Sequence, residues 1–376
     1  MGIVRYAHEA GWILEFAFRG AESLQGWRGD GILSQVHPTS EEYLDALKSL
    51  RVPRVDLAGL IADDNVAAVI PDYRTAGRLV AEHFLERGFT NFACLAKMND
   101  PRTSVVAKEG LEERLKSERM TVKTIDIMAM RDANAGDRAY QLHYPGDHLT
   151  PHMVSRLAQE IQTMPRPLAV MCHGTILAHD IFTTCKELGL LVPEDVSIAS
   201  FLPGEYLYDE AGAIPFTRIM SDYESQGYEA ARLLDQLMQG APIPKEPVLI
   251  PPIGIVVRQS SDTYAAGSIE VSRALVYIMR NFHRPNLYAP DVAAAANVSV
   301  RGLYRLFERH VGRSISEEIN RVRYEKAKRL LVDTDQAIKT IAETCGYGTP
   351  LRFRRSFHKA SGLNPTQYRR RVPLCS

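Results

Sequence analysis

Two short stretches of the sequence carry arginine at spacings that would place several guanidinium groups along one side of a helix. In the first stretch, DVAAAANVSVRGLYRLFERHVG (residues 291–312), arginine recurs at positions 301, 305 and 309. Residues four apart are neighbours on a helix surface, so these side chains would form a cationic row. A guanidinium can form two parallel hydrogen bonds with O6 and N7 of guanine, and its charge also attracts phosphate. The row is therefore a candidate surface for the major groove of double-stranded DNA.

The same pattern returns about fifty residues later, in IKTIAETCGYGTPLRFRRSFHKASG (residues 338–362). Arg305 corresponds to Arg355 and Phe307 to Phe357, whereas upstream of the turn the offset is one residue shorter. A single arginine row could be an ordinary solvated helix face, but two matched copies favour a duplicated helix–turn–helix that binds DNA. The candidate DNA-contacting residues are Ser299, Arg301, Tyr304 and Arg305 in the first copy and Thr349, Arg352, Arg354 and Arg355 in the second.

The residues around each arginine row predict how the helices are positioned. The alanines at 293–296 predict a slim first helix that the second helix crosses closely. Asn297 and Gly346 tolerate the left-handed conformation that the turn needs, and a hydroxyl follows each of them to cap the next helix. The residues expected to face the core are Leu303, Leu306, Phe307, Phe353 and Phe357.

A long helix is predicted between the two copies, over residues 314–333. Ser314 and Glu317 have the spacing of a capping box. Twenty helical residues rise roughly 30 Å, close to the separation of about 34 Å between successive major-groove faces of B-DNA. Residues 269–371 as a whole predict about seven helices and no strand.

The net charge of zero conceals an asymmetry between the two parts of the chain. Residues 268–376 hold 20 Lys and Arg against 9 Asp and Glu, although the whole chain holds 45 of each class. The earlier residues are therefore net acidic. A basic block on an acidic body indicates that a module for a polyanion is joined to one with another task.

Residues 269–371 resemble the DNA-binding domain of AraC-type transcription regulators. The second copy carries the family signature at Ile341, Ala342, Gly346, Phe353, Phe357, Gly362, Pro365, Tyr368 and Arg369. The chain departs from the family at Pro350 and Leu351, where polar base-facing residues are usual. The resemblance therefore implies that base recognition by the second copy depends on Thr349 and the three arginines that follow.

The first part of the chain alternates short apolar runs with amphipathic stretches, which predicts parallel sheets built from strand–helix–strand units. The predicted strands lie in 30–36, 52–60, 67–70, 92–96, 167–172 and 196–202, and predicted helices include 75–88 and 176–189. We expect an α/β domain over residues 1–262, a linker over 263–268 and the all-α DNA-binding domain over 269–371.

This α/β part resembles the two-lobed ligand-binding domain of LacI-type repressors and periplasmic sugar-binding proteins, especially in GLLVPEDVSIASF (residues 189–201). A LacI-type sensor followed by an AraC-type domain is the order of the xylose-operon regulators. The resemblance implies a sugar effector between the lobes. The candidate contacts are Asp72, Arg102, His173 and Asp222, each of which could instead have a structural role.

Several positions depart from the sensor family's pattern and predict weak or absent binding of D-xylose. Ala107 stands before a helix expected over 108–116 where an arginine is usual, HGT (residues 173–175) lacks the usual Asn or Asp, and Leu202 with Pro203 replaces an aspartate. A buried sugar needs hydrogen-bonding partners for its hydroxyls. Another sugar, a modified sugar or a sensor that has lost its ligand all remain open.

The start of the chain also departs from a LacI-type lobe, which opens with a strand and then a helix. VRYAHEAGW resembles the end of that first helix and ILEFAF the second strand, so we expect that the first strand is absent.

The remaining features exclude several classes of protein. No apolar run is long enough to span a membrane, the N-terminus has no secretory signal, and five scattered cysteines without a C-x-x-C pair indicate a reducing compartment and no zinc site. Nucleotide-binding, hydrolase and metalloprotease motifs are absent, which disfavours an enzyme.

We expect a cytoplasmic, ligand-responsive transcription activator that binds double-stranded DNA, a sugar effector and RNA polymerase. We expect it to form a homodimer and to need neither metal nor cofactor. The alternative is a cytoplasmic sugar-binding module without a regulatory role.

Overall fold

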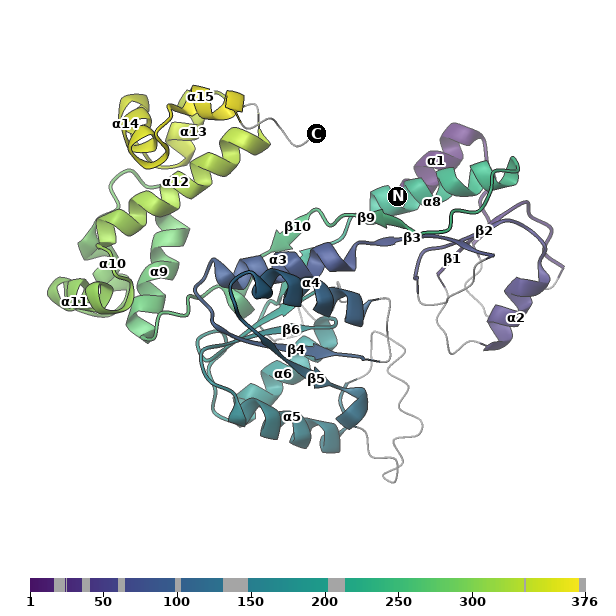
Figure 1. Cartoon of the computed structure of the whole chain (residues 1–376), viewed down its shortest axis with the longest axis horizontal. Coiled ribbons are helices and arrows are strands. Elements are labelled where there is room, and N and C mark those ends of the chain that lie inside the picture. Colours follow the sequence, from purple (N-terminus) through teal and green to yellow (C-terminus); the bar gives the residue numbers. More distant parts are fainter. Residues whose placement is uncertain are drawn as a thin grey trace. The chain divides into compact units, whose positions relative to one another are not determined.

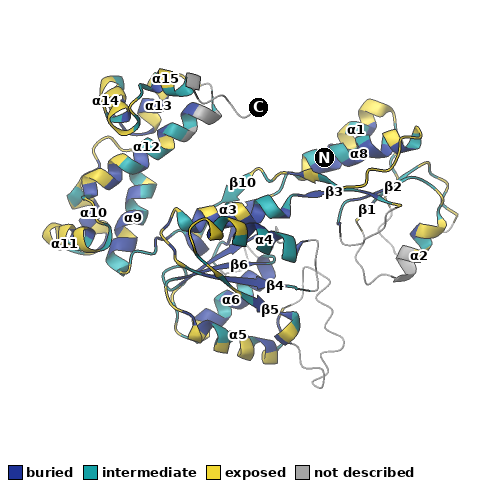
Figure 2. Cartoon of the chain, in the orientation of Figure 1, coloured by how far each residue is buried: buried dark blue, intermediate teal, exposed yellow. Residues whose placement is uncertain are grey.

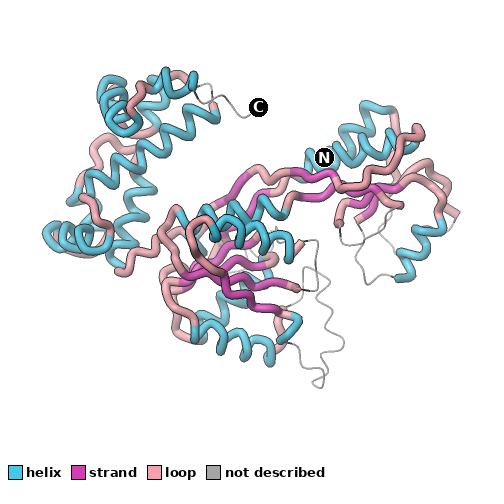
Figure 3. Tube along the Cα trace, viewed as in Figure 1, coloured by secondary structure: helices cyan, strands magenta, loops and turns pink. Residues whose placement is uncertain are grey.

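The chain folds into two compact units, residues Met1–Ser261 and Asp262–Ser376 (Figure 1). The computed structural model describes residues 1–16, 24, 26–35, 41–59, 65–98, 103–130, 148–201, 214–334 and 336–371. Strands alternate with helices in the first unit, whereas the described part of the second contains helices only (Figure 3). The α/β and all-α classes predicted for the two parts are therefore confirmed. Within the described ranges, no helix is long and apolar enough to cross a membrane.

The smaller sheet of the first unit has four parallel strands in the order β1–β2–β3–β9. They span Ile32–Ser34, Arg54–Asp56, Ala67–Pro71 and Val248–Ile250. Helix α8 (Tyr223–Met238) packs on this sheet through Ala230, Leu233, Leu234 and Leu237. Helix α2 spans Glu41–Ser49.

Helix α1 (Gly2–Ala10) contacts α8 and accounts for the helix predicted over VRYAHEAGW. The two helices approach so closely that a Cβ atom on Gly2 would lie 1.8 Å from the carbonyl oxygen of Glu224. The strand predicted over ILEFAF is wrong for residues 13–16, which form no strand, and its last two residues lie outside the described ranges.

The larger sheet has six strands in the order β10–β8–β7–β6–β4–β5, parallel except for β10 against β8. Helices α3 and α4 lie on one face and α5 and α6 on the other (Figure 1). Every residue of β6 and β7 is buried, as expected for parallel strands covered on both faces. The strands are β4 (Asn91–Ala96), β5 (Val122–Asp126), β6 (Leu168–Cys172), β7 (Val196–Ser200), β8 (Thr217–Met220) and β10 (Gly254–Val256). The helices are α3 (Tyr73–Leu85), α4 (Ser104–Lys116), α5 (Pro151–Thr163) and α6 (Thr175–Glu187), with single turns at Met128–Met130 and Gln259–Ser261.

The chain passes between the two sheets three times, from β3 to α3, from β8 to α8 and from β9 to β10. On the larger sheet, α3 and α4 cross at two glycines. A Cβ atom on Gly77 would lie 1.9 Å from the carbonyl oxygen of Ala107, and one on Gly110 would lie 2.0 Å from that of Arg74. Helix α4 begins at Ser104, earlier than predicted, so Ala107 lies within the helix and is fully buried.

The second unit contains seven helices in its described residues, the number predicted. They are α9 (Ile269–Asn281), α10 (Ala289–Ala295), α11 (Val300–His310), α12 (Ile315–Asp333), α13 (Ile338–Thr344), α14 (Pro350–Ser361) and α15 (Pro365–Arg371). Two separate apolar cores hold them together, one formed by α9, α10, α11 and the start of α12, the other by the end of α12 with α13, α14 and α15. Figure 2 shows buried positions along these helices. Because α12 contributes to both cores, it is the structural link between the two copies of the motif.

Candidate nucleic-acid interface and sensor site

The first helix–turn–helix consists of α10 and α11. Asn297 has φ 57°, the left-handed conformation predicted for the turn. The Ser299 hydroxyl caps α11 by accepting a hydrogen bond of 3.1 Å from the N–H of Gly302. Leu303 and Phe307 are fully buried in the first core. The predicted turn, cap and core positions of this copy are therefore confirmed.

The interpretation of the alanine run is only half correct. Ala293 and Ala296 are buried, as a close helix crossing requires, but Ala294 and Ala295 are exposed. The period of the helix explains this difference, because residues three apart face the same side whereas the two between them point away. Close packing thus accounts for two of the four alanines.

The second helix–turn–helix consists of α13 and α14. Gly346 has φ 72°, and the Thr349 hydroxyl caps α14 by accepting a hydrogen bond of 3.2 Å from the N–H of Arg352. Pro350 is the first residue of α14, where a missing N–H costs nothing. Phe353 and Phe357 are fully buried, with ring centroids 5.5 Å apart.

One arginine in each recognition helix lies directly opposite the core. Arg305 is two residues from both Leu303 and Phe307, so at about 100° per residue it points roughly 160° away from each. Arg355 has the same relation to Phe353 and Phe357. The remaining candidates of these two helices, Arg301, Tyr304, Arg352 and Arg354, are also exposed.

Unlike several other arginines of this unit, the candidate arginines lack an ion-pair partner among the described residues. In the described part of the chain, Arg301, Arg305, Arg352, Arg354 and Arg355 form no ion pair, so their charges are available to a phosphate or a base. By contrast, Arg313 and Arg321 both bind the buried carboxylate of Glu318. Burial alone would raise the pKa of Glu318, but the hydrogen bonds and charges of Arg321 and Arg313 outweigh burial and lower it.

A buried arginine that the sequence did not reveal joins the two motifs. Arg323 of α12 is 2% exposed and donates hydrogen bonds of 2.8 Å to the carbonyl of Phe282 and 2.6 Å to that of Arg284. The loop after α9, which contains Phe282, also packs closely against the second turn. A Cβ atom on Gly346 would lie only 2.3 Å from the Phe282 carbonyl oxygen. The loop after α9 therefore holds both α12 and the second turn in place.

The signature residue Arg369 also has a structural role. Its side chain donates hydrogen bonds to the carbonyls of Leu331 and Gln336, at 3.2 and 2.7 Å, and so connects α15 to the end of α12. The basic block thus contains two kinds of arginine, those that hold the helices together and those that face outward.

In the sensor unit, Asp72 and Asp222 cap helices at two of the crossings between the sheets. Asp72 accepts hydrogen bonds from the N–H and hydroxyl of Thr75 at 2.9 and 2.6 Å, and Asp222 accepts the same pair from Ser225 at 2.9 and 2.7 Å. The Ser225 N–H and hydroxyl lower the pKa of Asp222. Both carboxylates are thus engaged locally.

These two caps belong to a short repeat that sequence reasoning missed. DYRTAG (residues 72–77) and DYESQG (residues 222–227) share Asp, Tyr, Thr or Ser, and Gly in the same order. Both begin a helix that follows a strand of the other sheet, and in both the glycine is where another helix crosses. The shared spacing of Asp and a hydroxyl residue was the available signal for a cap.

His173 lies where β6 ends, beside residues from the neighbouring strands. Its Nδ1 atom is 2.7 Å from the hydroxyl of Ser104, which also accepts a hydrogen bond of 3.3 Å from the backbone N–H of Lys97. Burial, with a smaller effect of the Lys97 charge, lowers the pKa of His173 to about 3. His173 is therefore neutral at physiological pH and can exchange hydrogen bonds without carrying charge.

Two aromatic rings continue this group at the carboxyl ends of the strands. The ring of Phe201, after β7, is 5.2 Å from that of His173, and the ring of Tyr73 is 6.3 Å from that of Phe201. The sequence pattern does not distinguish Ser104, Phe201 or Tyr73 as site residues, although each directly follows a strand or begins a helix. Arg102, Leu202 and Pro203 lie outside the described residues.

Comparisons with known proteins match the two units of the chain to two different kinds of domain. Residues 81–261 match the model of the periplasmic binding protein-like domain, and residues 292–371 match that of a helix-turn-helix domain. The xylose operon regulatory protein of Escherichia coli (strain K12) is 26% identical over 96% of this chain and 90% of its own length. That of Haemophilus influenzae is 27% identical over 56% of this chain and 54% of its own length.

A solved structure of a xylose-binding transcription activator, xylR, aligns with 99% of this chain and 93% of its own, with a TM-score of 0.57 and 23% identity, and shows the same fold. A periplasmic-binding-protein-like sensor followed by a double helix–turn–helix defines a ligand-controlled DNA-binding protein. This chain is accordingly a DNA-binding transcription regulator with a periplasmic-binding-protein-like sensor domain, and it resembles the xylose operon regulators over nearly its whole length.

Proposed function

We propose that α11 and α14 enter successive major grooves of one DNA duplex, with Arg305 and Arg355 as the central base contacts. The observation that carries this proposal is the matched geometry of the two arginines, each exposed and opposite the buried residues of its helix. Both lie beyond the first turn of their helices, where a side chain reaches base edges as well as phosphates. The flanking candidate residues, including Ser299 and Thr349 with their capping hydroxyls, then contact phosphates and neighbouring bases.

The test is a binding titration with a duplex selected from a random pool by the full-length protein. Scrambling either half-site separately should weaken binding, because each half-site has its own recognition helix. Log affinity should also fall by about 0.9 per phosphate contact for each unit of log salt. If scrambling one half-site left affinity unchanged, one of the two helices would not read DNA.

We propose that the effector is a small carbohydrate bound at the carboxyl ends of β4, β6 and β7, beside His173. Support comes from the combination of a neutral imidazole, the Ser104 hydroxyl and the rings of Phe201 and Tyr73, since sugar sites pair hydrogen-bonding groups with apolar surface. We expect D-xylose itself to bind weakly or not at all, because Leu202 and Pro203 stand where the family has a polar group.

A thermal-shift screen of pentoses, hexoses and modified sugars tests the effector class. A ligand at 100 times its dissociation constant should stabilise the fold by about 2.7 kcal/mol. His173→Ala should abolish the shift without unfolding the chain. Micromolar binding of D-xylose in calorimetry would contradict the weak-xylose expectation, and the absence of any hit would favour a sensor that has lost its ligand.

The remaining partners are proposed on the resemblance to the xylose operon regulators. We infer that the protein acts in the cytoplasm as a homodimer that activates sugar-utilisation genes through contact with RNA polymerase. Sedimentation of the full-length protein and transcription from the selected site, with and without the protein, test the dimer and the direction of control.

A further inference from the structure

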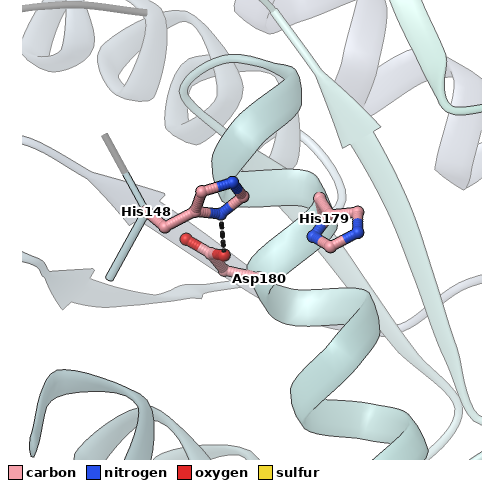
Figure 4. Close-up of side chains that lie close together, drawn as sticks. All are labelled: His148, His179 and Asp180. Atoms are coloured by element: carbon pink, nitrogen blue, oxygen red, sulfur yellow. Dashed lines mark hydrogen bonds and ion pairs between the residues drawn. The ribbon is translucent and has the colours of Figure 1, made fainter. Parts of the chain in front are cut away.

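Two histidines and an aspartate gather at the start of α5, on the face of the larger sheet that α5 and α6 cover (Figure 4). The Nδ1 atom of His148 is 2.6 Å from a carboxylate oxygen of Asp180. His179 precedes Asp180 in α6, and its ring centroid is 5.5 Å from that of His148. One ligand atom from each of the three residues lies within 4.8 Å of the other two.

The carboxylate of this cluster is held in a fixed orientation. The second oxygen of Asp180 accepts a hydrogen bond of 2.8 Å from the N–H of Leu149, next to the helix cap at Thr150. Asp180 is buried, whereas the side chain of His148 is 43% exposed. An ion could therefore approach from solvent past the exposed side of His148 and meet a carboxylate held in place by two hydrogen bonds.

We propose that His148, His179 and Asp180 form a binding site for a divalent cation, for which Zn²⁺ has the best-matched chemistry. Two imidazole nitrogens and one carboxylate oxygen are a donor set that zinc accepts, with water as a fourth ligand. Bonds of about 2.0–2.1 Å in a tetrahedral site separate neighbouring ligand atoms by about 3.3 Å. Binding therefore requires the His148 and Asp180 ligand atoms to separate by a fraction of an ångström. It also requires the ligand atoms that lie up to 4.8 Å apart to approach to the same spacing.

The bound ion would fasten the start of α5 to α6, which the His148–Asp180 hydrogen bond already connects. Metal binding to preformed ligands stabilises the folded state, because the unfolded chain does not assemble the site. The site is independent of the proposed DNA contacts, so its presence can be measured without any DNA or sugar.

The experiment compares the untagged full-length protein with His148→Gln and His179→Gln, and uses His152→Gln as a matched control. His152 is exposed on α5, outside the cluster, and reports binding by an ordinary surface histidine. Each protein is stripped with a chelator, checked for folding by circular dichroism and titrated with Zn²⁺ alone by calorimetry, with a parallel thermal melt. Asp180→Asn is less useful, because it also disturbs the hydrogen bond to Leu149.

We expect one equivalent of Zn²⁺ to bind the wild type and His152→Gln and to raise their melting temperatures. Affinity should fall at least tenfold in His148→Gln and His179→Gln while both remain folded. Failure of the folded wild type to bind one equivalent, or equal affinity in all four proteins, would overturn the proposal and leave the cluster as a hydrogen-bonded link between α5 and α6.

Discussion

The two helix–turn–helix motifs have the same outward face but different surroundings at their turns. Asn297 in the first turn is exposed, whereas Gly346 in the second is buried against the loop after α9. The outward arginines have the same relation to the core in both copies. The two copies of the motif therefore share the geometry of their outward face, whereas each turn packs against different neighbours.

The largest expected difference between the copies is in their tolerance of a side chain at the turn. Gly346→Ala should destabilise the second unit by about 2–5 kcal/mol, since the left-handed conformation and the clash with the Phe282 carbonyl both oppose a Cβ atom. Asn297→Gly should change stability by less than about 1 kcal/mol, because glycine accepts the same conformation at an exposed site. Denaturant unfolding followed by far-ultraviolet circular dichroism measures both. Equal unfolding midpoints for the two variants would contradict the expected difference between the two turns.

The next effect concerns the connection between the copies. Arg323→Met should cost about 1.5–3 kcal/mol, because the carbonyls of Phe282 and Arg284 lose a charged donor. It should also reduce DNA affinity, since the second recognition helix is no longer held at a fixed position relative to the first. Lys326→Met, an exposed change on the same helix, is the control. An Arg323→Met protein as stable as the control would show that other contacts fix α12.

The sequence predicted local features well and long-range ones poorly. The left-handed turn at Asn297 and the cap at Ser299 depend on neighbouring residues, so their signals lie within one short window. The partners of Arg323 are about forty residues away, and nothing near it distinguishes a buried arginine from a solvated one. In the sensor, Asp72 and Asp222 were ambiguous because a polar residue after a strand can bind a ligand or cap the next helix.

The DNA-binding face should show a graded response in each copy. Arg305→Ala and Arg355→Ala should each cost about 1–3 kcal/mol of binding and relax base preference in their own half-site. Arg354, only about 60° from Phe357 around the helix, should contribute to affinity but little to base preference. Titrations against the selected duplex and against duplexes scrambled in one half-site separate these effects. Wild-type discrimination in both Arg305→Ala and Arg355→Ala would refute the assignment of the recognition face.

The smallest effect is expected at the caps, where the two copies should behave alike. Ser299→Ala and Thr349→Ala each remove a hydroxyl that accepts one backbone N–H, so each should cost about 1 kcal/mol of stability. Ser299→Asp and Thr349→Asp retain the cap but place a negative charge beside the proposed DNA surface. They should therefore preserve the unfolding midpoint while weakening DNA binding, most strongly at low salt. If the aspartate variants bound DNA as tightly as the wild type, the ends of α11 and α14 would not lie near phosphates. The recognition helices would then have to approach the groove in a different orientation.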